Sequence, residues 1–467
     1  MLNQSVNCSS VEQNNQQLKN YSDDMMDLIQ YNFKKHPSNF SYKYEQIQEH
    51  PNMPIIETTE FPETNLMYTY YSLRSKTNSL YTNSIHRYPP KYIPDYSQWA
   101  IKKYLKQGGM IIDPFIGSGV TALTAIQFPY TNICGFDIDP LACLISKTKV
   151  TPLSEDKLLQ IRDDIIDRVS HSKVTPYKPH VIDILHWFNI GEVEDLGCIR
   201  SIIDDYKQDV DIYNFLLVTF SSIIQKCSLV ADRESKAFVS KKVIKIPAEA
   251  KSTFKNKLRQ NVASIISTSK VISSSSSCHI GCCDAKEISD AYFKQSQFQA
   301  DLAISSPPYI NSFDYPRSTK LSYMWIGDIL DVNNMNAHQR KFIGTEYISS
   351  EYYKKSNLTG VPTLDSQILC MFKKDKKKAG IVYKYFYDMS LHLREMTKVL
   401  KKGAHYILVV GTSNILGEEI MTHSHLTNIA IQHGFELDNI FASKILNKSL
   451  RNKRGLEYEW VLDLKKL

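Results

Sequence analysis

Short apolar runs alternate with stretches of helical periodicity in two separate parts of the chain. The strand-like runs lie at 110–113, 132–139, 278–284, 300–305 and 404–411. Strands that alternate with helices predict an α/β fold with a mostly parallel sheet. A helical pattern over 382–400 ends at Gly403, before the last of these runs. Two further runs, 436–443 and 457–464, are separated by a basic loop, which predicts a closing antiparallel hairpin.

A long stretch between residues 151 and 277 interrupts this alternation. Apolar residues recur there at helical spacing over 158–169, 193–206 and 212–227, so we predict a largely helical insertion that could form a subdomain of its own. The predicted organisation is a polar lead segment over 1–60, a main α/β domain made of 61–150 and 278–464, the insertion over 151–277, and an aromatic and basic segment over 310–378 inside the main domain.

The chain has 467 residues and a formal charge of +7, and its positive charge is clustered. Clusters lie at 373–378, at 448–454 and among the lysines between 241 and 259. Such clusters suit a polyanion, although each could equally be a solvated surface. The insertion is therefore one candidate for contacting a polyanion, and the 310–378 segment, in which rings and cations are interleaved, is another.

Cysteine usage and hydropathy exclude several classes of protein. The nine cysteines form no regular framework and no secretory segment opens the chain, which predicts reduced thiols in the cytoplasm. Cys278, Cys282 and Cys283 lack paired C-x-x-C spacing, so we expect no metal site. No apolar run approaches the roughly 20 residues that cross a bilayer, so we expect no membrane partner.

A glycine loop follows the apolar run at 110–113. Gly117 and Gly119 permit close approach of a ligand to the backbone, and the helix that begins beyond them offers N–H donors. Asp113, at the end of the strand, could bind an ammonium group. The next strand ends in Asp137 and Asp139, and an acid at this place binds ribose hydroxyls in dinucleotide folds. Asp137 is the first choice, because Asp139 could instead cap the following helix.

The sequence Ser306-Pro307-Pro308-Tyr309 follows the run at 300–305, where a buried strand would end. Two prolines cannot continue a sheet ladder, and they hold the carbonyls of Ser306 and Pro307 in a rigid turn. These acceptors could take the hydrogens of an amino group on a flat ring, while Tyr309 stacks on the ring face. The alternative is a loop that merely turns the chain.

A third acid completes the set of motifs. Asp284 ends the run at 278–284, from where a carboxylate can accept a hydrogen bond from the exocyclic amine of an adenine ring.

The order of these motifs resembles the S-adenosylmethionine-dependent DNA amino-methyltransferases. Their cofactor loop has the form D-P-F-x-G-S-G, and their catalytic turn is S-P-P-Y, N-P-P-Y or D-P-P-Y; the resemblance covers roughly 84–150 and 278–464. It implies a Rossmann-like methyltransferase fold, with a mostly parallel seven-stranded sheet. It also implies S-adenosylmethionine as the cofactor. The cofactor-binding residues that it implies, together with the acids above, are Asp113, Phe115, Gly117, Gly119, Asp137, Asp139 and Asp284.

Serine as the first residue of the turn is the form associated mainly with N4-methylcytosine, whereas asparagine or aspartate usually marks N6-adenine enzymes. The resemblance therefore implies a DNA cytosine-N4 methyltransferase, acting on double-stranded DNA alone or beside a cognate restriction endonuclease. Adenine-N6 methylation of DNA is the alternative. Methylation of RNA or of a protein glutamine, and non-catalytic nucleic-acid binding on the same scaffold, are more distant. The family's usual spacing has no insertion between Asp139 and Asp284, so the target-recognition region is left open.

The expected chemistry is set by the exocyclic amine of the target base, which is a poor nucleophile. Its lone pair is delocalised into the ring, and acceptors at Ser306 and at the Pro307 carbonyl would aim that lone pair at the methyl group. Serine is too weak a base to remove a proton first, so we expect proton loss after methyl transfer, to water or through a relay. The base must leave the duplex to reach the turn. Asp314, Tyr315 and Arg317 could line its pocket or fill the hole left in the DNA.

Overall fold

The computed structural model describes residues 55–62, 67–73, 84–88, 93–179, 181, 183–231, 237–240, 244–310, 314–327, 335–445 and 458–467. Several predictions from sequence lie outside these ranges. They concern the lead segment up to residue 54, Lys241 and Lys242 of the insertion, and the basic run 448–454.

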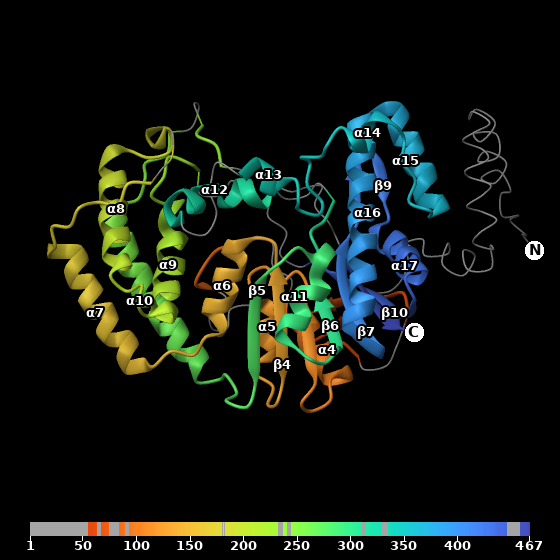
Figure 1. The fold of residues 1–467 in the computed structure, drawn as a ribbon, viewed down its shortest axis with the longest axis horizontal. Helices are drawn as coiled ribbons and strands as arrows, with labels where there is room; N and C mark the ends of the chain where they lie inside the picture. The colour runs from red at the N-terminus through yellow and green to blue at the C-terminus, as the bar shows by residue number, and fades with distance from the viewer. Residues whose placement is uncertain are drawn as a thin grey trace, which may run out of the picture.

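A single large sheet organises the described part of the chain, in the order β1-β2-β10-β11-β7-β6-β3-β4-β5 (Figure 1). The strands are β1 (Ile55–Thr58), β2 (Thr69–Leu73), β3 (Met110–Asp113), β4 (Asn132–Asp137), β5 (Ser277–Cys282), β6 (Ala300–Ser305), β7 (Leu400–Gly411), β10 (Phe435–Lys444) and β11 (Tyr458–Lys466). From β7 to β5 all neighbours are parallel, while β11 runs antiparallel to both β7 and β10. The α/β, Rossmann-like methyltransferase fold and its antiparallel hairpin are confirmed.

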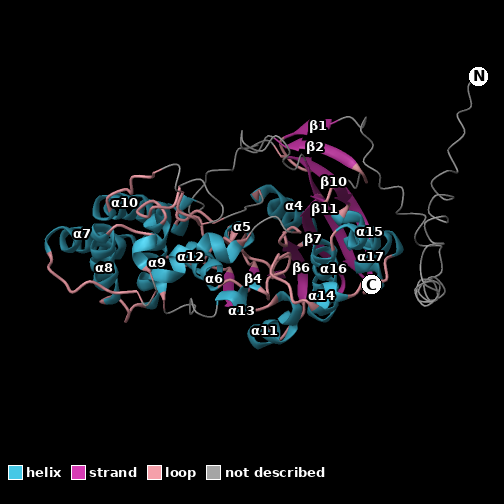
Figure 2. Cartoon of the chain, turned by 90° about the horizontal axis from the view of Figure 1, so that it is seen from above, coloured by secondary structure: helices cyan, strands magenta, loops and turns pink. Residues whose placement is uncertain are grey.

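Two strands extend this sheet beyond the predicted set. β1 and β2 pair in parallel with each other, and β2 pairs in parallel with β10 (Figure 2). β1 lies inside the predicted lead segment, so that segment contributes to the sheet from Ile55 onward. The alternation of apolar residues that marks a half-buried strand is weak there, because three of the four residues of β1 are exposed.

Helices cover both faces of the sheet. They are α4 (Pro94–Tyr104), α5 (Val120–Ala125), α6 (Pro140–Val150), α11 (Ile288–Gln295), α16 (Lys376–Val399) and α17 (Thr422–Gln432), with the 3-10 turn η3 (Ala285–Glu287) before α11. Successive residues of a strand point to opposite faces, so Ile111 packs into the core shared with α4 and α5, and Ile112 into the core shared with α11 and α16. The central strands are therefore apolar throughout, as the sequence predicted.

One predicted boundary is wrong. The helix expected over 382–400 begins at Lys376, where Asp375 caps it by accepting a hydrogen bond from the Lys378 N–H at 3.0 Å. It ends at Val399, and β7 begins at once with Leu400. Gly403, expected as the helix terminus, lies inside β7 with a φ of +78°. A positive φ suits a helix end and an irregular strand equally, so glycine alone did not distinguish them.

The insertion is helical, as predicted, with α7 (Glu155–His171), α8 (Ile190–Asp204), α9 (Val210–Ile224), α10 (Ala250–Ser269) and the 3-10 turn η2 (Ile184–His186). The insertion does not have a separate hydrophobic core, however. Leu141 and Ile145 of α6 and Trp325 of α12 (Tyr315–Ile326) belong to the same buried cluster. The insertion is thus packed onto the main domain through α6 and closed by a helix that lies far later in the sequence (Figure 1).

The basic residues of the insertion mostly bind within the protein. Lys251 pairs with Asp195 at 2.9 Å, Lys257 donates to the Ser84 carbonyl at 2.8 Å, and Lys245 donates to two backbone carbonyls of the insertion. Elsewhere, Lys374 of the 373–378 run pairs with Glu418. These contacts within the protein favour a structural role for these lysines over a role in binding a polyanion.

The described parts of the segment 310–378 contact the insertion at one end, where α12 packs on α9, and α16 at the other. After α12 the segment forms α13 (Met335–Gln339), α14 (Glu351–Lys354) and α15 (Pro362–Lys374), and α14 and α15 pack on α16. A small second sheet, β8 (Ser413–Ile415) with β9 (Glu418–Ile420), follows β7. Among the described helices, none combines the length and the apolar character needed to span a bilayer.

The packing of α12 yields a test of stability. Trp325 is 0% exposed and meets the rings of Phe188 and Phe220 edge to face. We expect Trp325→Ala to lower the free energy of unfolding by about 3 to 5 kcal/mol, because it leaves a large cavity where the insertion joins the main domain. Urea denaturation followed by far-UV circular dichroism measures this. Phe298→Ala is the control, since Phe298 is 72% exposed; equal losses in the two variants would refute the shared core.

Candidate functional site

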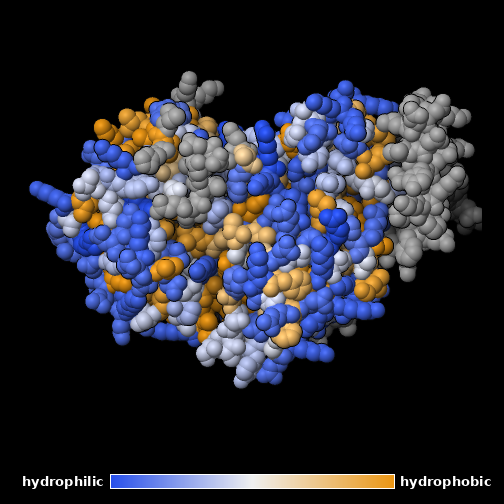
Figure 3. Space-filling model, in the orientation of Figure 1, coloured by the Kyte–Doolittle hydropathy of each residue, from blue (hydrophilic) through white to orange (hydrophobic). Residues whose placement is uncertain are grey.

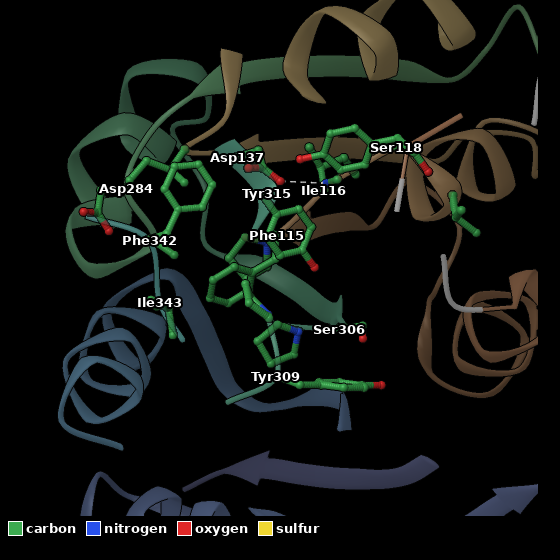
Figure 4. A pocket seen from close by; sticks show the side chains of 18 of the residues that line it. Phe115, Ile116, Ser118, Asp137, Asp284, Ser306, Tyr309, Tyr315, Phe342 and Ile343 are labelled. Carbon is green, nitrogen blue, oxygen red and sulfur yellow. Dashed lines mark hydrogen bonds between the residues drawn. The ribbon is translucent and has the colours of Figure 1, made fainter. Parts of the chain in front are cut away.

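The predicted motifs meet in one cavity at the carboxyl ends of the parallel strands. Its walls include Phe115 and Gly117 of the glycine loop, Asp137 after β4, Asp284 after β5, and the turn that follows β6 (Figure 4). Carboxyl ends of parallel strands lie along one edge of a sheet, which is where ligands bind in open α/β folds. The glycine loop and the double-proline turn therefore face a common space.

Two side chains of α6 hold the glycine loop. The Lys149 ammonium donates to the Ser118 carbonyl at 2.6 Å, and the Ser146 hydroxyl donates to the Gly117 carbonyl at 2.6 Å. Gly119 has a φ of +81°, and a Cβ there would come within 3.0 Å of Ser146. The loop is thus packed so tightly on α6 that only glycine fits, while Gly117 remains on the cavity wall.

Asp113 lies behind the cavity wall. Its carboxylate is 1% exposed and accepts hydrogen bonds from the Ser305 hydroxyl at 2.9 Å and the Phe115 N–H at 3.0 Å. Burial raises the pKa of Asp113 to about 6, while these hydrogen bonds lower it. The residue therefore fastens the start of the glycine loop to the end of β6, and the structure places it outside contact with the cavity.

The two acids after β4 have different places. Asp137 lines the cavity, and its carboxylate accepts from the N–H groups of Gly117 at 2.8 Å and Asp139 at 2.9 Å. The pKa of Asp137 is raised to about 7, mainly by burial and secondly by the negative charge of the neighbouring Asp139. Asp139 is fully buried and caps α6, accepting from the Leu141 N–H and the Tyr88 hydroxyl. The capping alternative for Asp139 agrees with its position.

Asp284 forms the far end of the cavity. It accepts a hydrogen bond from the Lys286 N–H at 3.0 Å, and the Lys286 ammonium lies 2.9 Å from the same carboxylate. That ammonium also donates to the Lys341 carbonyl, which ties the end of β5 to the 310–378 segment. Asp284 and Asp137 are thus at neighbouring strand ends, as a ligand with ribose and adenine groups requires.

The turn after β6 carries its side chains into the cavity. Ser306, Pro307, Pro308 and Tyr309 all line it. The Tyr309 hydroxyl donates to Glu459 at 3.0 Å. Glu459 also lines the cavity, from β11, and was not predicted from the sequence. The only sequence feature that marks it is an acidic residue directly before the apolar residues of a buried strand.

Of the residues predicted beyond the turn, Tyr315 reaches the cavity. Its ring is stacked 6.0 Å from Tyr88 and 6.3 Å from Phe342. Asp314 instead caps α12 and accepts a hydrogen bond from the Tyr347 hydroxyl at 3.1 Å, and Arg317 follows one turn into α12; neither belongs to the cavity wall.

Phe342 and Ile343 were also missed by the sequence analysis, although they lie inside the segment singled out for its rings and cations. Within the described residues, one group of possible metal ligands stands apart from the cavity: His405, Asp438 and Asp463. There, His405 of β7 and the Tyr104 hydroxyl of α4 both bind Asp463 of β11, as a hydrogen-bonded group that joins the helix to the sheet.

The site fits S-adenosylmethionine on its own geometry. A carboxylate at Asp137, already oriented by two backbone donors, has lone pairs left for ribose hydroxyls, and the glycine backbone at 117 borders the same space. Phe115, Tyr315 and Phe342 add apolar ring surface. Bound there, the cofactor would supply a methyl group on a sulfonium sulfur.

No protein-family model matches the chain. It is 23% identical over 419 residues to the Type II methyltransferase M.MvaI of Kocuria varians, covering 82% of this chain and 88% of that protein. It is 23% identical over 437 residues to the Type II methyltransferase M.BsoBI of Geobacillus stearothermophilus, covering 84% of each.

Among solved structures, the rRNA methyltransferase aviRa of Streptomyces viridochromogenes is similar at 9% identity and a TM-score of 0.33, over 84% of this chain and 93% of that one. The strand order, not this low score, identifies the fold. Similarity to Type II methyltransferases over four fifths of the chain, together with the cavity, supports an S-adenosylmethionine-dependent methyltransferase.

Proposed function

We propose that the protein is a site-specific DNA methyltransferase that transfers a methyl group from S-adenosylmethionine to the exocyclic N4 of cytosine. One observation carries the proposal: Gly117, Asp137 and the Ser306 to Tyr309 turn line one cavity, so a methyl donor and an amine acceptor can meet there. The Type II designation of the two relatives supports DNA as the substrate. The serine that opens the turn favours N4 of cytosine over N6 of adenine, which is the alternative.

Each residue of the turn has a separate task in this reaction. The Ser306 side chain and the Pro307 carbonyl accept the hydrogens of the amine, so that its lone pair points at the methyl group. The Tyr309 ring supports the face of the flipped base. Asp137 would hold the ribose of the cofactor, Asp284 its adenine amine, and Phe115 and Gly117 its remaining surface, while Gly119 lets the loop pack on α6. Asp113 and Asp139 support this site from behind.

Double-stranded DNA is the proposed macromolecular substrate. A second hollow adjoins the cavity and shares Asp284 and Lys341 with it. Arg340 lines this hollow together with Lys286 and Lys384, which are paired with Asp284 and Asp388. Arg340 is exposed and has no acidic partner among the described residues, so it is available to a phosphate. The surface is hollowed between the insertion and the ends of α14 and α15, above α13 (Figure 3). We place the duplex there, flanked by both segments, with Tyr315 and Arg317 near the displaced base.

The proposal extends to a restriction-modification system in the cytoplasm, with a restriction endonuclease of the same specificity as a partner. It is tested by incubating the purified protein with DNA and S-adenosylmethionine and resolving the nucleoside digest by mass spectrometry. We expect N4-methylcytosine. Recovery of N6-methyladenine alone would replace cytosine by adenine, and methyl transfer to RNA but not to DNA would overturn the proposal.

Substitutions in the double-proline turn and in the glycine loop should affect different steps, the first the rate of methyl transfer and the second the affinity for the cofactor. We expect Ser306→Ala to lower the single-turnover rate by about 100-fold with little change in cofactor affinity, because the serine acts on the amine. We expect Gly117→Val to weaken cofactor binding instead, because its side chain would enter the cavity. Calorimetry and rapid-quench assays separate the two effects.

Gly108→Val is the matched control for the glycine substitution. Gly108 also has a positive φ, of +80°, but nothing lies within 4 Å of a Cβ there. This variant shares the backbone strain and lacks the obstruction, so its cofactor affinity should stay normal. Equal losses of affinity in the two glycine variants would show that strain, and not the cavity, is responsible.

Cofactor affinity should depend on pH through Asp137. The free protein binds a proton at this carboxyl with a pKa of about 7, whereas ribose hydroxyls donate to the ionised form. Affinity should therefore fall as pH decreases below about 7, by up to about tenfold per pH unit. Titration calorimetry between pH 5.5 and about 8 measures this. Asp137→Asn should bind weakly at every pH; a variant that keeps the wild-type pH dependence would assign it to another group.

A further inference from the structure

Three side chains follow one another away from the point of reaction. The Ser306 side chain lies within reach of the Tyr309 phenol, and the Tyr309 hydroxyl donates a hydrogen bond to Glu459 Oε1 at 3.0 Å. All three residues line the cavity, and Ser306 and Tyr309 lie side by side in the close view (Figure 4). The line joins the predicted amine acceptor to a carboxylate on a different strand, β11.

We propose that Glu459 is the final acceptor of the proton lost by the target amine, which reaches it through Ser306 and Tyr309. This inference rests on the proposed function, because it concerns the same amine. Neither serine nor a backbone carbonyl can keep a proton, so the turn needs a further proton acceptor.

Glu459 is suited to take up a proton. Its carboxylate is held by two phenols, Tyr309 and Tyr96 of α4, the latter donating to the other oxygen at 3.2 Å. No cationic side chain pairs with it among the described residues. Glu459 is half-buried, and a carboxylate that is partly shielded from water without a cation becomes less costly once protonated. Consistently, burial raises its pKa above the ordinary value, while the two phenols lower it.

The step balances in atoms and electrons. The amine lone pair forms the N–C bond, and the carbon–sulfur bond pair returns to sulfur, which becomes a thioether. The nitrogen, now positive, keeps its N–H bond pair and gives the proton to Ser306 Oγ. Ser306 gives its own hydroxyl proton to Tyr309, and Tyr309 gives its proton to Glu459, which becomes neutral. While the N–C bond forms, the negative charge on Glu459 stabilises the positive charge that grows on nitrogen.

The simpler alternative is that Glu459 only fixes the position of the Tyr309 ring. The chain offers a matched control, because Tyr96 donates to the same carboxylate without lying between it and Ser306. Tyr96→Phe therefore removes one support of Glu459 and leaves the proposed route intact. Tyr309→Phe removes the route and leaves the ring.

The experiment compares single-turnover methylation of DNA by the full-length wild-type protein, Glu459→Gln, Tyr309→Phe and Tyr96→Phe, in H2O and in D2O. We expect the first two variants each to lose about 100-fold in rate, and the double variant Glu459→Gln/Tyr309→Phe to lose no more than either alone. We expect Tyr96→Phe to lose less than about threefold. A solvent isotope effect present in the wild type should disappear in Glu459→Gln and Tyr309→Phe.

Thermal unfolding and the affinity for S-adenosylhomocysteine, measured on each variant, identify any loss of folding or of cofactor binding. A Glu459→Gln protein that folds and keeps the wild-type rate and isotope effect would overturn the inference, and so would a Tyr96→Phe protein that loses as much as Tyr309→Phe. If Glu459→Gln does not fold, the rate and isotope effect of Tyr309→Phe decide. These results differ from failure of the proposed function, in which the wild-type protein itself would not methylate DNA.

Discussion

The buried carboxylate of Asp113 is the contact on which the site depends. It joins the end of β3 to the first N–H of the glycine loop and to the last side chain of β6, immediately before the double-proline turn. The glycine loop and the double-proline turn are therefore linked to each other through one carboxylate. Its burial is costly, and its hydrogen bonds, to which Thr121 also contributes, offset that cost.

A second constraint is the way the insertion is attached. Its core takes in α6, whose Lys149 and Ser146 hold the glycine loop, and α12, whose first residue Tyr315 lies in the cavity wall. Movement of the insertion would therefore displace both the glycine loop and Tyr315. The insertion, the glycine loop and the aromatic residue Tyr315 of the cavity wall are thus parts of one packed unit.

Burial also sets the chemistry of the acids around the cavity. Asp113, Asp137 and Glu459 all have raised pKa values, with burial as the largest cause in each case. Their partners are mainly N–H and hydroxyl groups, not cations, so each carboxylate is oriented without being neutralised. Carboxylates that are oriented by hydrogen bonds and not neutralised by cations can attract a positively charged cofactor and can accept a proton.

The local sequence by itself determined the strands, the glycine loop and the double-proline turn, because these depend on periodicity and on backbone restrictions that neighbouring residues impose. It also determined the closing hairpin, and it left open the alternative by which Asp139 caps α6. It failed where the deciding contacts join distant residues. β2 is held by pairing with β10 and β1 by pairing with β2, Glu459 meets Tyr309 across 150 positions, and α12 belongs to a core built mainly from residues 158–265. Only the tertiary structure brings such pairs together, because a contact between distant segments produces no recurring hydrophobic pattern in the sequence of either segment.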